Sequence, residues 1–234
     1  MPIGPQRRDA LQIKLANWTD QMRREFQRTL PMLVKKRFLV PTLGLLTLFM
    51  VRAELQETAP DHQRERISAY IEAFQPRGMT AAEHENLVES IMEQADALEV
   101  PPNMRIDGRP VVRAYLIAAY IRVESSFYRY ARSTSDARGY MQLKPTTVAW
   151  LDQIGGSRSR VGSMYDTRTN VELGVEYINY LMALQRDVRV TALSYNMGPG
   201  NVARGRYDED YWEKILYTYR ILMSGEFEEE RVTL

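Results

Sequence analysis

The stretch PVVRAYLIAAYIRV, residues 110–123, decides the fold class of this chain of 234 residues. Apart from its two arginines it is apolar on every side of a helical wheel, whereas a helix at a protein surface shows one polar face. We therefore expect residues 110–125 to form a central helix that other helices cover.

The segments on both sides of this stretch also show the helical spacing of apolar residues. Thr80 and Glu83 form a capping box at the start of one predicted helix, and Pro145 suits the first position of another. No convincing alternation of apolar and polar residues is present, so the expected fold class is all-α, with at most a small hairpin near residues 103–109. The expected helices cover residues 59–75, 80–98, 110–125, 145–155, 170–186, 190–196 and 210–223.

Glu124 lies in the last turn of the predicted central helix, one turn after Tyr120 and Ile121. Burial disfavours the charged form of a carboxyl group, so the pKa of a carboxyl on this apolar stripe should rise. A carboxyl that is protonated near neutral pH can serve as a general acid. Position alone leaves an equal alternative, in which Glu124 caps a neighbouring helix or forms a salt bridge, for instance through Arg122.

The composition narrows the chemistry further. The chain has no Cys, which excludes disulfides, thiolate nucleophiles, Cys-ligated zinc and a lipid-modified cysteine. Its two histidines, His62 and His84, lie well apart in polar helical settings, which argues against a Ser-His-Asp triad and a histidine-rich metal site. Carboxylate chemistry remains, and we expect neither a metal nor another cofactor.

The net charge of +1 hides an asymmetry between the two ends of the chain. Residues 1–51 hold nine Lys and Arg against three Asp and Glu, whereas the remainder is acidic. Residues 38–51, FLVPTLGLLTLFMV, carry no charge and follow Lys35, Lys36 and Arg37. This order of charges is typical of a membrane segment whose amino-terminal side stays in the cytoplasm.

Residues 38–51 are short for a membrane span, since fourteen residues of helix rise about 21 Å and the hydrocarbon core is about 30 Å thick. An uncleaved membrane anchor is the favoured interpretation. A signal cleaved after Ala53 and a buried core helix are the alternatives. In residues 7–37 arginines alternate with apolar residues, which favours a cytoplasmic or membrane-surface amphipathic helix over nucleic-acid binding. Residues 1–37 are also a candidate binding arm for a protein partner.

Further motifs follow Glu124 in a fixed order. They are ESSF at 124–127, ARGYMQLKPTT at 137–147, NVELGVEYINYL at 170–181, ALSYNMGPG at 192–200 and YWEKIL at 211–216. This order and spacing resembles the catalytic domain of the soluble-type (SLT) lytic transglycosylases, which share a glycoside hydrolase family with goose-type lysozyme. The resemblance covers residues 80–223 and implies a lysozyme-like helical domain with a glycan-binding cleft.

The resemblance also implies roles for individual residues. Glu124 matches the sole catalytic acid and base of the family. The phenol of Tyr195 would bond this carboxyl, and the amide of Asn196 would hold a sugar. Packing around Glu124 is the alternative for Ser125, Met141 and Tyr195. The residues that match substrate-contacting positions are Ser125, Ser133, Tyr140, Met141, Gln142, Tyr195 and Asn196.

Three positions depart from the family pattern. Tyr140 stands where the family usually has Leu, and Ser194 stands where it usually has Ala; both suit a polar cleft. Asp136 stands where the family usually has Gly, which leaves open either an unusual local backbone or a second carboxylate near the site.

The number of carboxylates sets the expected mechanism. Ordinary glycosidases use two, whereas the motifs here supply one. The resemblance implies that Glu124 protonates the oxygen between N-acetylmuramic acid and N-acetylglucosamine and then takes a proton from the C6 hydroxyl, which closes a 1,6-anhydro ring. An internal nucleophile reaches effective molarities of about 10⁵ to 10⁸ M, so water is not needed. The alternatives are a hydrolytic muramidase that uses Asp136, and a non-catalytic scaffold of an envelope complex.

These expectations place the catalytic domain in the bacterial periplasm, attached to the inner membrane by a single span. Peptidoglycan lies outside that membrane, so the charge pattern and the site agree. The expected layout is a cytoplasmic arm at 1–37, an anchor at 38–51, a helical linker at 52–79, the catalytic domain at 80–223 and an acidic tail at 224–234.

Overall fold

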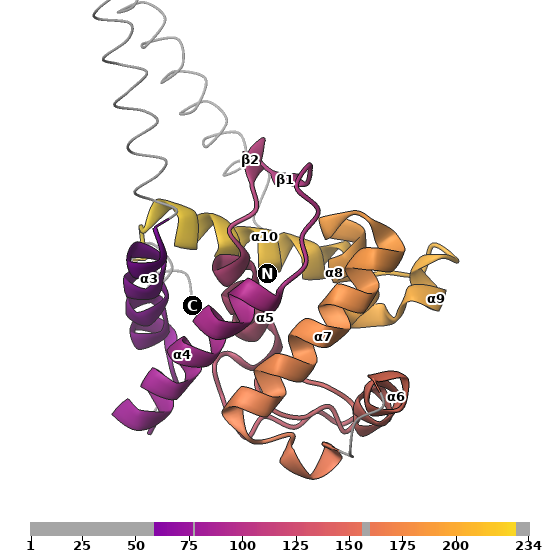
Figure 1. The fold of residues 1–234 in the computed structure, drawn as a ribbon, viewed down its shortest axis with the longest axis horizontal. Coiled ribbons are helices and arrows are strands. Elements are labelled where there is room, and N and C mark those ends of the chain that lie inside the picture. The colour runs from indigo at the N-terminus through magenta and orange to yellow at the C-terminus, as the bar shows by residue number, and fades with distance from the viewer. Residues whose placement is uncertain (1–58, 77, 156–159, 228–234) are drawn as a thin grey trace, which may run out of the picture. The chain divides into compact units, whose positions relative to one another are not determined.

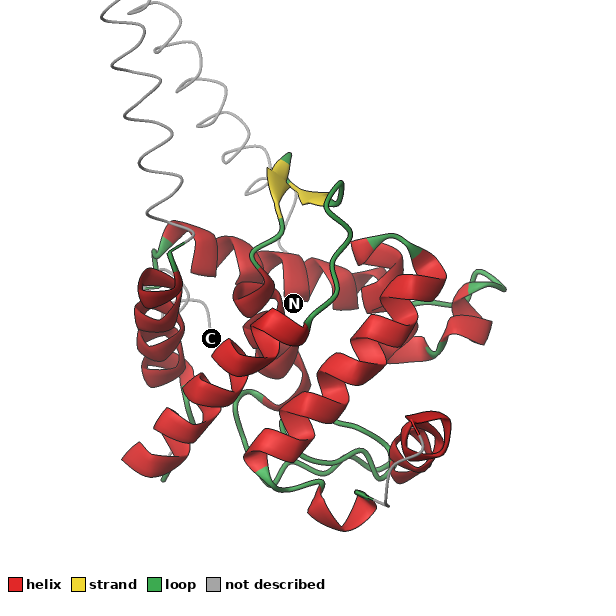
Figure 2. Cartoon of the chain, in the orientation of Figure 1, coloured by secondary structure: helices red, strands yellow, loops and turns green. Residues whose placement is uncertain are grey.

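The computed structural model describes residues 59–76, 78–155 and 160–227, and this part of the chain is mostly helical (Figure 1). Figure 2 shows that helices make up nearly all of its regular structure, with one small hairpin. The all-α expectation is confirmed. In chain order the elements are α3 (Pro60–Phe74), α4 (Ala81–Ala97), β1 (Arg105–Ile106), β2 (Arg109–Pro110), α5 (Arg113–Ser125), α6 (Pro145–Gly155), the 3₁₀ helix η1 (Val161–Ser163), α7 (Thr167–Gln185), α8 (Val188–Met197), α9 (Pro199–Val202) and α10 (Glu209–Ser224).

Helix α5 is the centre of the core, as its sequence predicts. All eight residues from Ala114 to Ile121 are fully buried. Helices α3, α4 and α10 pack against it (Figure 1). Continuous burial explains why the stretch has no polar face: no side of this part of the helix meets water.

The start of α5 differs from the sequence expectation. The helix begins at Arg113 rather than at residue 110, because Pro110 pairs with Arg105 in the hairpin. Asp107 and Gly108 form its turn, with φ of 53° and 78°. Both central residues of a type I′ turn have positive φ, which Gly tolerates freely and Asp better than most residues.

Polar side chains cap four of the described helices, and the sequence predicts the first of these caps. Thr80 accepts a hydrogen bond from the backbone N–H of Glu83, which confirms the predicted capping contact at α4. Asp166, Asp187 and Asp208 cap α7, α8 and α10 in the same manner. Each cap satisfies a backbone N–H that has no partner within its helix and thereby sets the residue at which the helix begins.

Helix α3 lies within the segment that the sequence suggests as a linker. Its buried side chains Ile67, Tyr70 and Ile71 belong to the same hydrophobic core as α4 and α5. Tyr70 also contacts Phe127, just after α5, edge to face at 5.9 Å between ring centroids. The core of the described domain therefore begins at α3.

The predicted arm at 1–37 and the predicted anchor at 38–51 lie outside the described residues. Among the residues that the structure does describe, no helix combines the length and the apolar character needed to cross a membrane.

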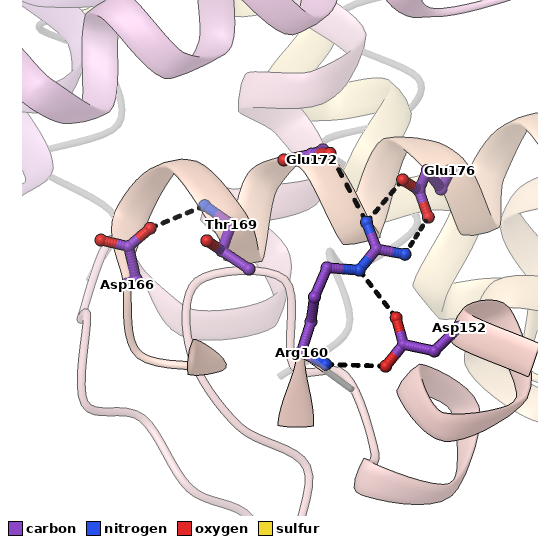
Figure 3. Close-up of polar contacts among 6 residues, drawn as sticks. All are labelled: Asp152, Arg160, Asp166, Thr169, Glu172 and Glu176. Atoms are coloured by element: carbon purple, nitrogen blue, oxygen red, sulfur yellow. Dashed lines mark hydrogen bonds and ion pairs between the residues drawn. The ribbon is translucent and has the colours of Figure 1, made fainter. Parts of the chain in front are cut away.

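Arg160 joins α6 to α7, as Figure 3 shows. Its Nε donates to Asp152 Oδ1 at 2.7 Å, and its backbone N–H donates to Asp152 Oδ2 at 2.8 Å. Its two terminal nitrogens donate to the carboxylate of Glu176 at 2.7 and 2.8 Å. Hydrogen bonds to Glu176 and then Asp152 raise the pKa of Arg160 despite its partial burial. One guanidinium thus holds both helices at fixed positions.

Replacing Arg160 by leucine should destabilise the domain by about 3 kcal/mol, because it leaves the buried Asp152 carboxylate without its partner. Urea unfolding would measure this difference. The matched control is Arg168→Leu, since Arg168 pairs with Glu93 on the exposed surface and its removal should cost less than about 1 kcal/mol. Equal losses in the two variants would contradict the structural role of Arg160.

Candidate active site

Glu124 lies at the point where the buried helix α5 meets solvent. The helix ends at Ser125, and Ser126 takes the left-handed conformation with φ of 49°, which turns the chain away. Ile121, one turn earlier, is fully buried, whereas Glu124 is half-buried. The end of the central helix therefore delivers one carboxyl group to the edge of the core.

The pKa of Glu124 is raised to about 7, and burial is the cause. A hydrogen bond from Tyr211 acts in the opposite direction: the phenol Oη donates to Glu124 Oε1 at 2.5 Å. Burial therefore raises the pKa of Glu124 by more than the hydrogen bond from Tyr211 lowers it. Near neutral pH the group exchanges its proton readily, which suits both the release and the recovery of a proton.

Tyr211 comes from the first turn of α10, 87 residues after Glu124 along the chain. Tyr211 opens the motif YWEKIL at 211–216, but the motif alone predicts no role for it in the site. One sequence signal could have found it. Tyr211 shares a helical stripe with the buried Ile215 and Tyr219, so its phenol must point into the core.

Three tyrosines face Glu124 from three helices: Tyr120 from α5, Tyr195 from α8 and Tyr211 from α10. Burial and then the charge of Glu124 raise the pKa of all three phenols. The rings of Tyr120 and Tyr195 meet edge to face with centroids 5.0 Å apart. Three neutral phenols thus lie close to the carboxyl group, and one of them, Tyr211, donates a hydrogen bond to it.

The expected hydrogen bond from Tyr195 to Glu124 is wrong. The hydroxyl of Tyr195 donates instead to the backbone carbonyl of Met141 at 2.7 Å, and the donor to Glu124 is Tyr211. The physical reason is local. The loop that contains Met141 presents this carbonyl to α8, and a buried phenol bonds the acceptor within its reach.

Residues 139–142 form a tightly held loop. Met141 is fully buried, and its backbone N–H donates to Asn170 Oδ1 at 2.8 Å. The amide nitrogen of Asn170 donates to Met164 O at 2.7 Å. Tyr140 is also fully buried and donates to Glu83 Oε1 at 3.0 Å, so its side chain points toward α4 rather than solvent. Asn170, the first residue of the motif at 170–181, is the anchor of this loop.

Gln142 uses its amide nitrogen to brace the same loop, with bonds to Ala131 O at 3.0 Å and Gly139 O at 2.9 Å. These bonds orient the amide group; contact with an N-acetyl group stays a prediction. Ser133 Oγ accepts from the backbone of Ala137 at 3.0 Å and from Ser135, which closes a turn.

The two remaining candidates lie at helix ends. Ser125 Oγ donates to the carbonyl of Ile121 at 3.1 Å, within its own helix. Asn196 is exposed at the end of α8, next to Tyr195. Their contact with substrate also stays a prediction.

Asp136 has a local explanation for its departure from glycine. Its φ is 63°, a left-handed conformation in which Asp is tolerated better than most residues. Its carboxylate accepts from Arg138 at 2.7 and 3.0 Å and from Arg132 at 2.7 Å. Arg138 and then Arg132 hold the pKa of Asp136 below its usual range. Its oxygens are occupied by guanidinium groups, so it is poorly suited to activate water.

An open pocket of about 360 Å³ lies near Tyr195. Tyr177 lines the pocket and contacts Tyr195, with 5.3 Å between the ring centroids. Two further rings of the lining, Trp150 and Tyr180, contact each other with centroids 4.6 Å apart. Pro199 and two threonines complete the lining, Thr146 and Thr147. Apolar walls with a few hydroxyl groups are suited to small organic ligands such as a sugar ring.

The described ranges contain no group of three or more His, Asp or Glu side chains placed to hold a metal ion. The chemistry that this arrangement offers is proton transfer by Glu124, supported by Tyr211.

The high pKa of Glu124 makes a prediction about stability. In the unfolded chain this carboxyl ionises near 4.5, but in the folded protein it does so near 7. As pH rises from 4.5 to 7 the unfolded state binds fewer protons than the native state, so the free energy of unfolding falls by about 3 kcal/mol. The free energy of unfolding of Glu124→Gln should not show this fall, because glutamine does not ionise. Urea unfolding at about pH 4 should therefore give similar stabilities, whereas at about pH 8 the variant should be the more stable protein.

A known domain family matches this part of the chain. Residues 105–216 match the model described as the transglycosylase SLT domain. The match includes Glu124, Gln142, Tyr195 and Tyr211.

Several curated proteins are similar over shorter stretches. Membrane-bound lytic murein transglycosylase E of Buchnera aphidicola is 39% identical over 69 residues, which are 28% of this chain and 31% of that protein. Membrane-bound lytic murein transglycosylase C of Yersinia pestis is 35% identical over 105 residues, 40% of this chain and 29% of that protein. Soluble lytic murein transglycosylase of Escherichia coli is 29% identical over 98 residues, 41% and 15% of the two chains. The chain thus spans a third or less of each of these relatives.

Among solved structures, the 70 kDa soluble lytic transglycosylase SLT70 of Escherichia coli has a TM-score of 0.42 and 21% identity to this chain. The similarity covers 58% of this chain and 22% of that one.

Proposed function

Residues 105–216 belong to the transglycosylase SLT domain family, and we propose that the protein is a peptidoglycan lytic transglycosylase. It cleaves the β-1,4 bond between N-acetylmuramic acid and N-acetylglucosamine without water and leaves a 1,6-anhydromuramic acid end. The observation that carries the proposal is Glu124: a half-buried carboxyl with a pKa of about 7, held by Tyr211.

In the first step protonated Glu124 donates its proton to the glycosidic oxygen, and the bond from that oxygen to C1 of muramic acid breaks. The substrate's own N-acetyl carbonyl stabilises the positive charge that develops at C1. In the second step the Glu124 carboxylate takes the proton of the C6 hydroxyl, whose oxygen attacks C1 and closes the anhydro ring. Glu124 ends protonated, ready for the next bond.

The pocket between α6 and α7 supports a glycan substrate. Its aromatic walls, Trp150, Tyr177 and Tyr180, suit the apolar face of a sugar ring, and its threonines suit hydroxyl groups. The contact between Tyr177 and Tyr195 joins the pocket to the surroundings of Glu124. We expect one amino sugar of the strand to occupy it.

Mass spectrometry of peptidoglycan digested by the purified full-length chain tests the proposal, because it identifies substrate and reaction together. The expected products end in 1,6-anhydromuramic acid. Products with reducing muramic ends would identify a hydrolase and overturn the proposal. The pairing of Asp136 with two arginines argues against hydrolysis, which needs a second carboxylate to position water.

We further propose that residues 38–51 anchor the protein in the bacterial inner membrane, with residues 1–37 in the cytoplasm, available to a protein partner, and the SLT domain in the periplasm. The support is the basic cluster that precedes the uncharged run. Protease added to spheroplasts should digest the SLT domain. Its protection until the inner membrane is lysed would contradict this location.

A further inference from the structure

Tyr120 carries a buried hydroxyl group that has no hydrogen-bond partner among the described residues. The residue is fully buried in the middle of the core. Buried polar groups in native proteins nearly always have partners, so an exception of this kind calls for an explanation. The phenylalanine side chain would fill the same space without leaving an unpaired donor, and yet the chain has tyrosine.

The position of this hydroxyl relates it to Glu124. Glu124 follows Tyr120 by four positions in α5, and this spacing places their side chains on one face of the helix. The charge of Glu124 acts on the Tyr120 phenol and contributes to its raised pKa. No hydrogen bond joins the two groups, and among the described residues the donor to Glu124 is Tyr211.

The other two phenols that face Glu124 are already engaged. Tyr211 donates to Glu124 Oε1, and Tyr195 donates to the carbonyl of Met141. The ring of Tyr195 also packs against Tyr120 and limits where its hydroxyl can move. Of the three phenols that surround Glu124 from α5, α8 and α10, Tyr120 is thus the one with an unused donor.

We propose that Tyr120 is a positioning residue whose hydroxyl donates a second hydrogen bond to Glu124 once that carboxyl has lost its proton. A neutral carboxylic acid needs few donors, whereas an ionised carboxylate away from water needs several. The charged form arises in the middle of the reaction proposed above, on which this inference rests. The hydrogen bond from the Tyr120 hydroxyl stabilises the Glu124 carboxylate and holds it in the orientation in which it takes up a proton again.

The test is the pKa of Glu124 in the Tyr120→Phe variant, measured on the full-length protein by NMR of ¹³C-labelled glutamate carboxyl groups, with Glu124→Gln used to assign the signal. Loss of a donor to the charged form should raise the pKa by about one unit. At about pH 5, where Glu124 is protonated, the variant should melt about 2 °C higher than the wild type, because it removes an unpaired buried hydroxyl. The kcat should fall about tenfold with KM unchanged.

Tyr195→Phe is the matched control, since it removes a phenol hydroxyl that is bonded to Met141 instead. It should lower the melting temperature and leave the pKa of Glu124 near its wild-type value. An unchanged Glu124 pKa in Tyr120→Phe would overturn the inference, and so would a lower melting temperature under the same acidic conditions, which would show that the hydroxyl already has a partner. The titration does not depend on turnover. If the wild-type protein fails to cleave peptidoglycan but Tyr120→Phe still raises the pKa of Glu124, the result contradicts the proposed function and not this inference.

Discussion

Glu124→Gln should reduce the formation of anhydromuropeptides at least about 1,000-fold, because glutamine neither donates a proton to the glycosidic oxygen nor takes one from the C6 hydroxyl. Positioned general acids and bases each contribute about 10² to 10⁴ in rate, and here one side chain performs both tasks. The side chain keeps its size, and the raised pKa of Glu124 predicts that the variant is at least as stable as the wild type at about pH 8. The loss should therefore appear in kcat, with glycan binding retained.

The measurement is the initial rate of anhydro-product release from purified peptidoglycan. Glu213→Gln is the matched control, because Glu213 is exposed on α10 only two residues after Tyr211. It should keep wild-type activity. Activity of Glu124→Gln within tenfold of the wild type would contradict the assigned role of Glu124. A wild-type phenotype of Glu124→Gln in cells would favour the scaffold alternative.

Gly139→Ala should destabilise the domain by about 3 kcal/mol and reduce activity more than about tenfold. Gly139 has φ of 77°, a left-handed conformation that costs alanine about 1 kcal/mol. A Cβ atom there would lie 2.5 Å from the carbonyl oxygen of Met164 and 2.4 Å from Nδ2 of Asn170, and such overpacking costs a further 1–3 kcal/mol, roughly. Moving Asn170 would also loosen its bond to Met141, and with it the loop that presents Gln142.

Urea unfolding and the rate of product release measure the two effects of Gly139→Ala. Gly108→Ala separates the causes, because Gly108 has nearly the same φ, 78°, and a Cβ atom added there would have no neighbour within 4 Å among the described residues. It should lose only about 1 kcal/mol and keep its activity. If both alanine variants lost the same stability, the close packing against Asn170 would have no energetic importance.

Much of the local structure follows from the sequence. The apolar stretch before Glu124 predicts a buried helix, and α5 is buried throughout its middle. The Thr80 capping contact occurs where the sequence predicts it, and the expected small hairpin forms around Asp107 and Gly108. These features depend on residues within a few positions of one another, so neighbouring side chains and the backbone preferences of single residues are enough to determine them.

The hydrogen-bond partners of the buried polar side chains do not follow from the sequence. The family resemblance predicts that Tyr195 bonds Glu124, but the donor is Tyr211, and Tyr195 bonds a loop carbonyl instead. Both phenols are buried and both lie close to the carboxyl. Which of them bonds it depends on how α8 and α10 pack beside the end of α5, and sequence spacing does not contain this information.

The order of amino acids alone establishes that this chain forms a helical domain, that a carboxyl group closes its most apolar helix, and that the motifs of one family follow in order. Those properties reside in composition, periodicity and spacing along the chain. The folded structure was needed to show that Tyr211 holds Glu124, that Tyr120 keeps an unused hydroxyl beside it, and that arginines occupy Asp136. A hydrogen bond needs its donor and acceptor within about 3 Å of each other. The packing of helices that are distant in sequence decides which groups come that close.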